Sequence, residues 1–156
     1  MNKKFAVMLL CLFLFGAFYN LWESRPVNIL YAYSNEGITV TLVVDHMPWT
    51  DRAKIDWYLA RRDDFENKYP YSGNIWQSFY ITDIGDGFTN YKKSPHEDLL
   101  CFTVIKNESN CVVKNYFLIV YEYADGTPRF FSDSEMEYRL TPDNKIERVF
   151  RPDALE

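Results

Sequence analysis

The sequence is short of positive charge, and this shortage limits the partners that it can bind. It holds 17 lysines and arginines against 22 aspartates and glutamates, which gives a formal net charge of −5. Lys3 and Lys4 are the only charged residues of positions 1–22, so positions 23–156 carry a net charge of −7. Nucleic acids and anionic lipid headgroups both bind basic surfaces. The composition therefore argues against both, and no nucleic-acid partner is expected.

Histidine is scarcer still, and the motifs of common enzymes are missing. The two histidines, His46 and His96, have acidic neighbours in the sequence. These neighbours are Asp45, Asp51, Glu97 and Asp98. A metal or acid–base site is one interpretation, but no His-x-x-x-His spacing accompanies it, and two solvated loop histidines are the simpler reading. There is no Gly-x-Ser-x-Gly elbow, Walker loop or Rossmann glycine pattern, so no catalytic residue and no cofactor are predicted.

Cysteine occurs three times, as Cys11, Cys101 and Cys111. Cys11 lies in the apolar N-terminal segment, which leaves Cys101 and Cys111 as the only pair in the rest of the chain. In an oxidising compartment such a pair forms a structural disulfide, and closing a loop of about eleven residues would stabilise the fold by about 2–3 kcal/mol. The alternatives are a metal site, which lacks further ligands nearby, and a redox-active pair, which usually shows Cys-x-x-Cys.

Tracts rich in proline, glycine or serine are absent, and there is no internal repeat. Aromatic residues make up 18% of the sequence and are spread along it, which is the opposite of a disordered composition. After an N-terminal anchor at 1–22, positions 23–156 have the size of one ordinary domain with its own core.

What the sequence does contain is an uncharged run from Phe5 to Trp22. As a helix its 18 residues would span about 27 Å, close to the hydrocarbon thickness of a bilayer. Lys3 and Lys4 precede the run, whereas Glu23 and Arg25 cancel each other after it. The positive-inside rule therefore places the N-terminus in the cytoplasm and the rest of the chain outside. The side chains expected to contact the membrane are Phe5, Leu9, Leu12, Phe15, Tyr19 and Trp22.

The same run also resembles a removable signal peptide. A cleavage site needs small residues in an Ala-x-Ala arrangement, but the best position, after Ala17, has Phe15 two residues earlier. Cys11 lies in mid-run, where a lipoprotein site is poor. Tyr19 and Trp22 at the end of the run suit an interfacial aromatic belt. An uncleaved signal anchor is therefore favoured over cleavage.

The pattern after the anchor predicts an α+β architecture, in which an N-terminal transmembrane helix precedes one mostly antiparallel β-sheet domain with one main helix. Thr50 can cap that helix, which ends before Pro70. The run 112–123 is apolar on both faces, which indicates a central strand beneath the helix. The disulfide Cys101–Cys111 would join the ends of one hairpin. Strands are expected at 27–33, 38–44, 75–84, 99–106, 112–123, 129–132, 135–140 and 145–150.

Two local features are candidate sites. In Asp83-Ile-Gly-Asp-Gly-Phe88 the carboxylates of Asp83 and Asp86 lie beside glycines and could bind a hard cation. The spacing is not that of an EF-hand, and a tight turn that needs glycine's positive φ is the simpler interpretation. Trp57 points away from the apolar side of the predicted helix. It either packs against a second part of the core or forms an exposed aromatic at a partner surface.

Several segments, taken in order, resemble a known family. They are the anchor, Arg25-Pro26-Val27, Lys54-Ile-Asp-Trp-Tyr-Leu59, Asp83-Ile-Gly-Asp-Gly-Phe88, Leu100-Cys-Phe102 and Asn110-Cys111. From the anchor to about Leu140, the chain resembles the enterobacterial putative membrane protein family known as domain of unknown function nine-four-three. The resemblance implies a bacterial inner-membrane protein with a periplasmic domain, and it supplies no catalytic residues.

Two functions of different classes fit these features. The first is a non-enzymatic interaction module, in which a membrane-tethered acidic domain binds a protein partner in the periplasm through a sheet edge or an aromatic patch. Immunity against an incoming toxin and an accessory role in the envelope are two versions of it. The alternative is a periplasmic metal-dependent hydrolase or small-ligand-binding domain that uses His46, His96, Asp83 or Asp86. The missing catalytic constellation favours the first.

Overall fold

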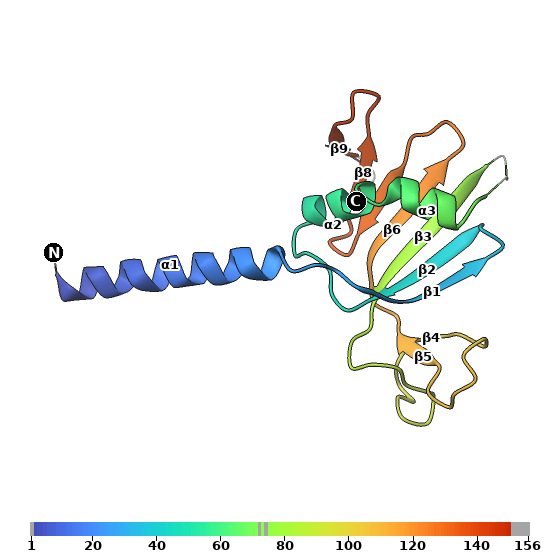
Figure 1. The fold of residues 1–156 in the computed structure, drawn as a ribbon, viewed down its shortest axis with the longest axis horizontal. Helices are drawn as coiled ribbons and strands as arrows, with labels where there is room; N and C mark the ends of the chain where they lie inside the picture. The colour runs from blue at the N-terminus through green and yellow to red at the C-terminus, as the bar shows by residue number, and fades with distance from the viewer. Residues whose placement is uncertain (1, 72, 74, 151–156) are drawn as a thin grey trace, which may run out of the picture.

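The computed structural model describes residues 2–71, 73 and 75–150, and it begins with one long helix that stands apart from the rest. This helix, α1 (Lys3–Glu23), extends away from the domain as a single rod, and none of its residues is buried (Figure 1). Its 21 residues span about 32 Å at 1.5 Å each, enough to cross a hydrocarbon core. Among the described residues it is the one helix that is long and apolar enough to cross a membrane.

The domain is built on a seven-stranded sheet with the strand order β1-β2-β3-β6-β7-β8-β9. Neighbouring strands are antiparallel except β2 and β3, which are parallel. The strands are β1 (Ile29–Asn35), β2 (Thr39–Val44), β3 (Trp76–Asp83), β6 (Tyr116–Tyr123), β7 (Arg129–Ser132), β8 (Glu137–Leu140) and β9 (Ile146–Arg148). The predicted α+β fold with a mostly antiparallel sheet is confirmed, and β6 occupies the predicted central position.

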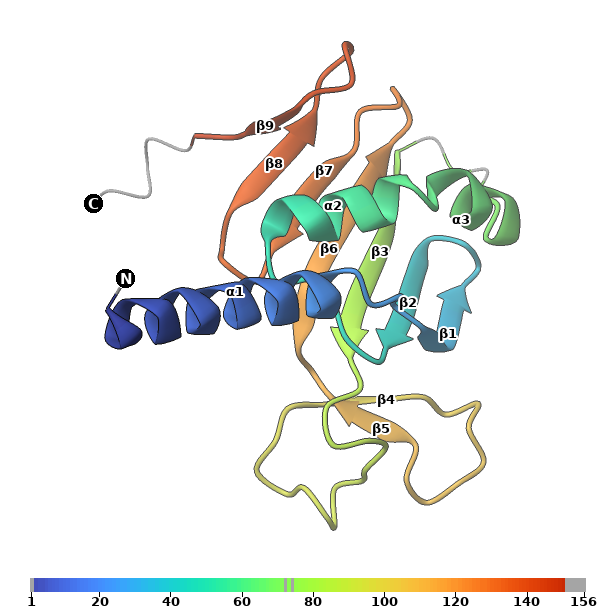
Figure 2. The same ribbon diagram turned by 60° about the vertical axis from the view of Figure 1, so that its left-hand side comes forward.

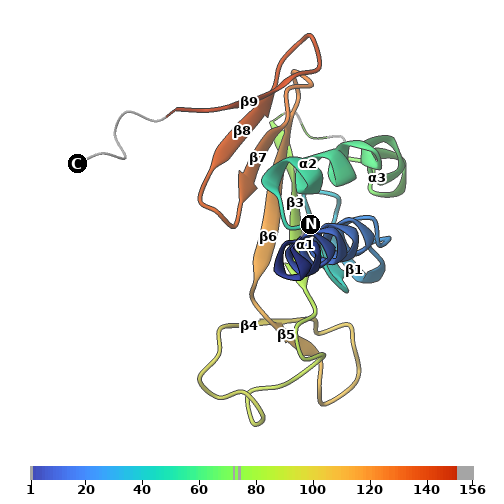
Figure 3. The same cartoon turned by 90° about the vertical axis from the view of Figure 1, so that its left-hand side faces the viewer.

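Two short helices connect the parallel strands, because a parallel pair needs a crossover between its strands. They are α2 (Asp51–Leu59) and α3 (Arg62–Lys68), and both lie over the same face of the sheet (Figures 2 and 3). As predicted, Thr50 caps α2, since its Oγ1 accepts a hydrogen bond from the Ala53 N–H at 3.2 Å. The prediction of one continuous helix before Pro70 is wrong. The chain leaves the helical region at Arg61, where φ is −118° and ψ is 2°.

The break between α2 and α3 has a tertiary cause, since neither proline nor glycine occurs there. The rings of Tyr58 on α2 and Phe65 on α3 both contact Phe79 of β3, with centroid distances of 5.4 and 5.7 Å. At the start of α3, the Arg62 guanidinium forms two hydrogen bonds with the Glu122 carboxylate of β6, at 2.9 and 2.7 Å. A change of direction lets both helices follow the sheet, so packing overrides the local helical pattern.

Residues 84–115, between β3 and β6, form a separate lobe that we call the disulfide lobe. Its strands β4 (Leu99–Cys101) and β5 (Cys111–Val113) pair antiparallel below the main sheet (Figure 1). The predicted disulfide is present between Cys101 and Cys111, which face each other across the pair, with an S–S distance of 2.08 Å.

Two predicted strands in this part of the chain are wrong in extent. The strand predicted at 99–106 ends at Cys101, and the one predicted at 112–123 is divided between β5 and β6. The division falls beside Asn115, whose carbonyl oxygen accepts hydrogen bonds from the Asp83 N–H and the Thr82 hydroxyl at 3.2 and 3.0 Å. These bonds turn the chain out of the lobe and into the main sheet.

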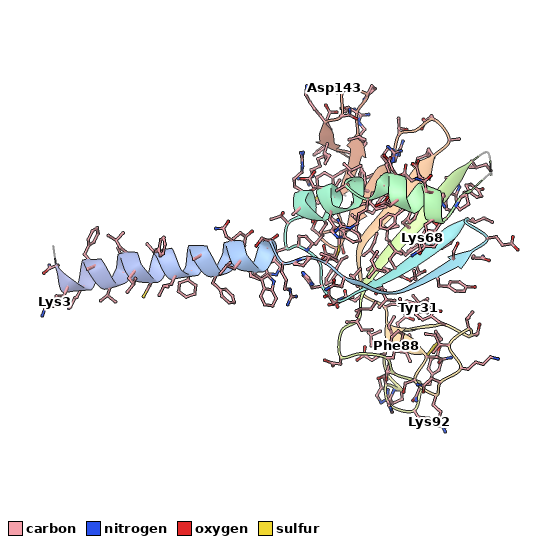
Figure 4. All side chains as sticks on the ribbon, viewed as in Figure 1. Lys3, Tyr31, Lys68, Phe88, Lys92 and Asp143 are labelled. Carbon is pink, nitrogen blue, oxygen red and sulfur yellow. A yellow bond between two sulfur atoms is a disulfide. The ribbon has the colours of Figure 1, made fainter. Side chains whose placement is uncertain are left out.

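The main core lies between the helices and the sheet face that they cover. Its fully buried side chains include Val40, Leu42, Val44, Ile55, Tyr58, Phe79, Ile81, Leu118, Val120 and Phe130. A smaller cluster of Val43, Phe102 and Val112 joins the disulfide lobe to the opposite face of the sheet. Tyr31 of β1 and Phe88 of the lobe meet at this boundary, with ring centroids 6.2 Å apart (Figure 4). Among the described residues, the packing contacts of the lobe with the opposite face therefore lie mainly over β1 and β2.

Candidate functional site

The part of the sheet that neither the helices nor the disulfide lobe cover is lined with aromatic side chains. Because side chains alternate along a strand, Phe79 and Ile81 of β3 face the helices, whereas Trp76 and Tyr80 face the other way. By the same alternation Ile119, Tyr121, Tyr123 and Phe131 lie on the side of Tyr80. Tyr116 joins them because the pairing of β3 with β6 shifts between Ile81 and Thr82, which places Tyr116 opposite Thr82. We call this surface the aromatic face, and its residues are Trp76, Tyr80, Tyr116, Ile119, Tyr121, Tyr123 and Phe131.

The rings of the aromatic face contact one another across three strands. Tyr121 of β6 lies between Trp76 of β3 and Phe131 of β7, with edge-on contacts at centroid distances of 5.3 and 5.5 Å. Tyr80 and Tyr116 are a second contacting pair, at 5.2 Å. Such edge-on pairs stabilise a preformed arrangement. The rings are half-buried by one another, with Trp76 the most exposed, at 37%.

The centre of the aromatic face is uncharged. The hydroxyl oxygens of Tyr80 and Tyr121 are 3.4 Å apart, within hydrogen-bond distance. The hydrogen bond with Tyr121, together with burial, raises the pKa of Tyr80 to about 12. Burial also raises the pKa of Tyr116 above its ordinary value. These phenols are therefore protonated at neutral pH, and they offer a partner hydroxyl groups and ring faces without charge.

Charged side chains border this centre as ion pairs. Arg129 and Glu137 are 3.3 Å apart, and Arg139 and Glu147 are 3.2 Å apart. The Arg129 guanidinium also lies over the Tyr123 ring, 5.6 Å from its centroid. An apolar centre with a polar rim is the usual composition of a protein–protein interface, in which tyrosine, tryptophan and arginine are enriched.

A second cluster of aromatic side chains joins α1 to the domain. Trp49, which precedes α2, contacts Tyr19 and Trp22 of α1, with ring centroids 5.2 and 6.1 Å away. We call these three residues the aromatic collar. The Glu23 carboxylate accepts a hydrogen bond from the Trp49 N–H at 2.8 Å, and the Arg25 guanidinium lies 4.5 Å from the centroid of a Trp22 ring. The last turn of α1 is thereby fixed to the domain.

His46 connects this junction to the sheet. Its Nδ1 is 2.7 Å from an Asp45 carboxylate oxygen, and its Nε2 is 3.3 Å from both Nε and the carbonyl oxygen of Arg25. Burial tends to raise the pKa of Asp45, but hydrogen bonds from the Asn28 backbone and side chain and from His46 outweigh it and lower that pKa to about 2. Both ring nitrogens of His46 are therefore engaged in structural contacts.

A cavity of about 440 Å³ lies where α1 meets the domain. Its aromatic walls are Trp22, Trp49 and Phe117, and its charged walls are Lys54, Asp83 and Asp133, with His46 at one side. Lys54 is almost completely buried and forms an ion pair with Asp133. The cavity thus combines ring faces with carboxylates at the end of the apolar helix.

The structure brings together only two of the four predicted acid–base or metal residues. His46 and Asp83 line the cavity, whereas Asp86 and His96 are exposed in the disulfide lobe. Gly85 and Gly87 have φ values of +54° and +103°, so the predicted tight turn is confirmed. Both histidines lie in loops, as predicted. The side chain of His96 is exposed to solvent, as predicted, but that of His46 is half-buried, so the prediction of a solvated side chain is wrong for His46. Among the described residues no group of three His, Cys, Asp or Glu side chains could hold a metal ion.

Trp57 is a core residue and does not form an exposed partner surface. It is 8% exposed, its ring contacts Phe65 at 6.0 Å, and the Arg61 guanidinium lies 4.9 Å from its centroid. The break before α3 brings Phe65 against it, which corresponds to the core-packing alternative. Its Nε1 is buried and has no hydrogen-bond partner among the described residues.

The aromatic face was not identified from the sequence, although a signal for it exists. Tyr80, Tyr121 and Tyr123 fall at alternate positions of runs that are apolar on both faces. The apolar pattern of 112–123 predicts a central strand beneath the helix, and it does not predict an open face. Only the packing of α2 and α3 on the sheet shows which face the helices cover and which they leave open.

An apolar N-terminal helix joined to a small α+β domain fits a single-pass membrane protein. The chain belongs to the family described as enterobacterial putative membrane protein (DUF943), which matches residues 2–150. The resemblance noted from the sequence is therefore confirmed. No curated protein and no solved structure matches the chain.

Proposed function

We propose that this protein is a non-enzymatic interaction module, anchored by α1 in the bacterial inner membrane, with its domain in the periplasm. The observation that carries the proposal is the aromatic face, a preformed apolar surface that no other part of the described chain covers. Monomeric proteins rarely leave such contiguous surfaces open unless they bind something. Tyrosine and tryptophan are the side chains that most often dominate binding energy at protein interfaces.

The anchor part of the proposal is supported by charge and by the aromatic collar. Lys3 and Lys4 precede α1, so the positive-inside rule favours a cytoplasmic N-terminus. Tyr19 and Trp22 in the last turns of α1 suit the membrane–water interface, and both contact Trp49 of the domain. A disulfide between Cys101 and Cys111 suits an oxidising compartment.

The occupant that we propose for the aromatic face is a protein. The face is wide and uncharged at its centre, and its rim carries alternating ion pairs that can set the register of a partner. Immunity against a toxin and an accessory role in the envelope would both require a protein-binding surface, and the identity of the partner decides between them.

In-cell photo-crosslinking tests this proposal. A photoreactive residue at Ile119, in the middle of the aromatic face, is expected to give one discrete adduct with an envelope protein. The same residue at Asp63, exposed on α3, serves as the control and is expected to give none. Trp76→Ala should remove most of the Ile119 adduct, while Ile75→Ala, a change at the adjacent exposed residue, should leave it intact. Equal adducts from both faces, or none from Ile119, would contradict the proposal.

A further inference from the structure

We infer that the cavity at the junction of α1 and the domain binds the primary ammonium group of a phosphatidylethanolamine headgroup. The inference rests on the proposed membrane anchor, and it does not depend on the aromatic face. The cavity is lined by Trp22, in the last turn of α1, and by Trp49, which together form most of the aromatic collar. Because tryptophans at the end of an apolar span lie among the lipid headgroups, the cavity lies at the level of the headgroups.

The walls of the cavity have the chemistry that binds an ammonium group. Ammonium groups are attracted to the faces of aromatic rings and to carboxylates, and this cavity offers three rings and two carboxylates. The side chain of Lys54 shows that its walls accept such a group. Its Nζ pairs with Asp133, lies 3.8 Å from Asp51, and is 5.6 Å from the Phe117 ring centroid.

One carboxylate in the cavity remains available to a ligand. The charge of Lys54 is balanced by Asp133 and Asp51, so Lys54 does not neutralise Asp83. Oδ1 of Asp83 accepts a hydrogen bond from the Gly85 N–H at 3.0 Å. Among the described residues, its Oδ2 has no hydrogen-bond or ion-pair partner. The cavity therefore keeps a net negative charge, which disfavours an anionic headgroup and favours a cationic one.

The Arg25 guanidinium, beside the cavity, can bind the phosphate of the same headgroup. The Arg25 guanidinium lies 4.5 Å from the centroid of a Trp22 ring, and Arg25 forms no ion pair with any described residue. Since Trp22 also lines the cavity, a zwitterion can place its ammonium group near Asp83 and its phosphate near Arg25. Phosphoethanolamine at the end of a lipid has this arrangement of charges. Phosphatidylcholine carries the same phosphate but no N–H group that can donate to Asp83.

The test measures which lipid the full-length protein retains. The protein is reconstituted into nanodiscs that contain phosphatidylethanolamine and phosphatidylcholine with the same acyl chains, and the lipids that remain bound are counted by native mass spectrometry. We expect one phosphatidylethanolamine to be retained in roughly five- to tenfold preference over phosphatidylcholine. Equal retention of the two lipids would overturn the inference.

Asp83→Asn is the decisive variant, because asparagine keeps the Oδ1 atom that accepts from Gly85 and loses only the charge. It should abolish the preference for phosphatidylethanolamine, and Arg25→Ala should weaken retention of both lipids. Asp86→Asn makes the same charge change in the same turn but outside the cavity, so it should behave as the wild type. If Asp83→Asn retains the preference for phosphatidylethanolamine, the ammonium group does not bind at Asp83, and the inference is wrong.

Two further readouts separate the possible failures. In the first readout, nanodiscs of phosphatidylcholine alone are titrated with O-phosphoethanolamine. If this soluble amine binds as tightly as the lipid and its binding depends on Asp83, the cavity is a site for a free amine. That result would overturn the lipid assignment. The intact mass shows whether α1 is still present, and a mass without it would overturn the inference together with the proposed anchor. Asp83→Asn should leave the photo-crosslink at Ile119 unchanged, so loss of one result does not imply loss of the other.

Discussion

The two faces of the sheet carry similar residues but bury them in different ways. On the face covered by the helices, Tyr58 is fully buried and donates a hydrogen bond to the Glu122 carboxylate at 2.9 Å. Burial and that carboxylate raise the pKa of Tyr58 far above its ordinary value. On the aromatic face, the hydroxyl groups of Tyr80 and Tyr121 lie within hydrogen-bond distance of each other and pair with no carboxylate among the described residues. The first arrangement holds the fold together, whereas the second leaves ring surface exposed to solvent.

Leu118 and Ile119, adjacent on β6, give the sharpest test of this difference and the largest expected effect. Leu118 is fully buried beneath the helices, and Ile119 is half-buried on the aromatic face. Leu118→Ala should lower the free energy of unfolding by about 2–5 kcal/mol, because it leaves a cavity in the core. Ile119→Ala should lower it by only about 1 kcal/mol. Chemical denaturation of the full-length protein in detergent measures both, and equal losses would contradict the comparison.

The disulfide lobe covers one corner of the otherwise open face, and removing its crosslink should expose that corner. The double change Cys101→Ser and Cys111→Ser is expected to lower the free energy of unfolding by about 2–3 kcal/mol in the chain-entropy model. Hydrogen exchange should rise in residues 84–115 and around Tyr31 and Val43, which pack against the lobe. Exchange in β6 and β7 should stay as in the wild type. Faster exchange throughout the sheet would show that the lobe is not a separate unit.

A smaller effect is expected from acid at Asp45, beside the junction with α1. Its pKa falls from an ordinary value of 3.8 to about 2 in the fold. A carboxyl with a lowered pKa stabilises the fold above the unfolded pKa, and this contribution is lost as the pH falls from about 4 towards 2. The full shift would correspond to about 2.4 kcal/mol, and solvent screening of this partly exposed carboxyl makes the expected loss smaller, about 1 kcal/mol. In Asp45→Asn this part of the pH dependence should vanish, and an unchanged acid profile would contradict the assignment.

The smallest effect is expected from Tyr121→Phe, which removes one hydroxyl from the aromatic face. The free energy of unfolding should change by less than about 0.5 kcal/mol, as for most surface substitutions. The phenol of Tyr80 should then titrate below its wild-type pKa of about 12, because its hydrogen-bond partner is gone. Carbon-13 NMR of protein with labelled tyrosine rings, which resolves single tyrosines, measures this shift against pH. Tyr123→Phe is the control, and an equal shift there would mean that Tyr121 is not the cause.

Local features predicted much of the fold, and the residues that were misjudged depend on contacts between distant parts of the chain. The cap at Thr50, the turn at Gly85 and Gly87 and the disulfide depend on neighbouring residues or on composition, and all were predicted. The break at Arg61 depends on the contact of Arg62 with Glu122, sixty residues further along the chain, so no local pattern indicates it. The burial of Trp57 follows from that break.

The candidate sites likewise depend on contacts between distant parts of the chain, which the sequence pattern does not indicate. That Asp83 and His46 line one cavity depends on strand order, because the loop after β2 and the end of β3 become neighbours only in the parallel pair. The aromatic face likewise depends on which side of the sheet receives the helices. Alternating tyrosines predict a strand with two apolar faces, but they do not indicate which face remains open.

The short connection between α1 and β1 has a consequence for how the proposed partner would reach the aromatic face. Only five residues separate the two elements, and the aromatic collar fixes the helix to the domain. Viewed along α1, the sheet is seen edge-on, so the aromatic face is directed perpendicular to the helix axis (Figure 3). With α1 upright in a bilayer, that face is directed along the membrane surface. Its partner would then approach from the side by diffusing within or along the same membrane, and the encounter rate would depend on the number of molecules per unit area of membrane.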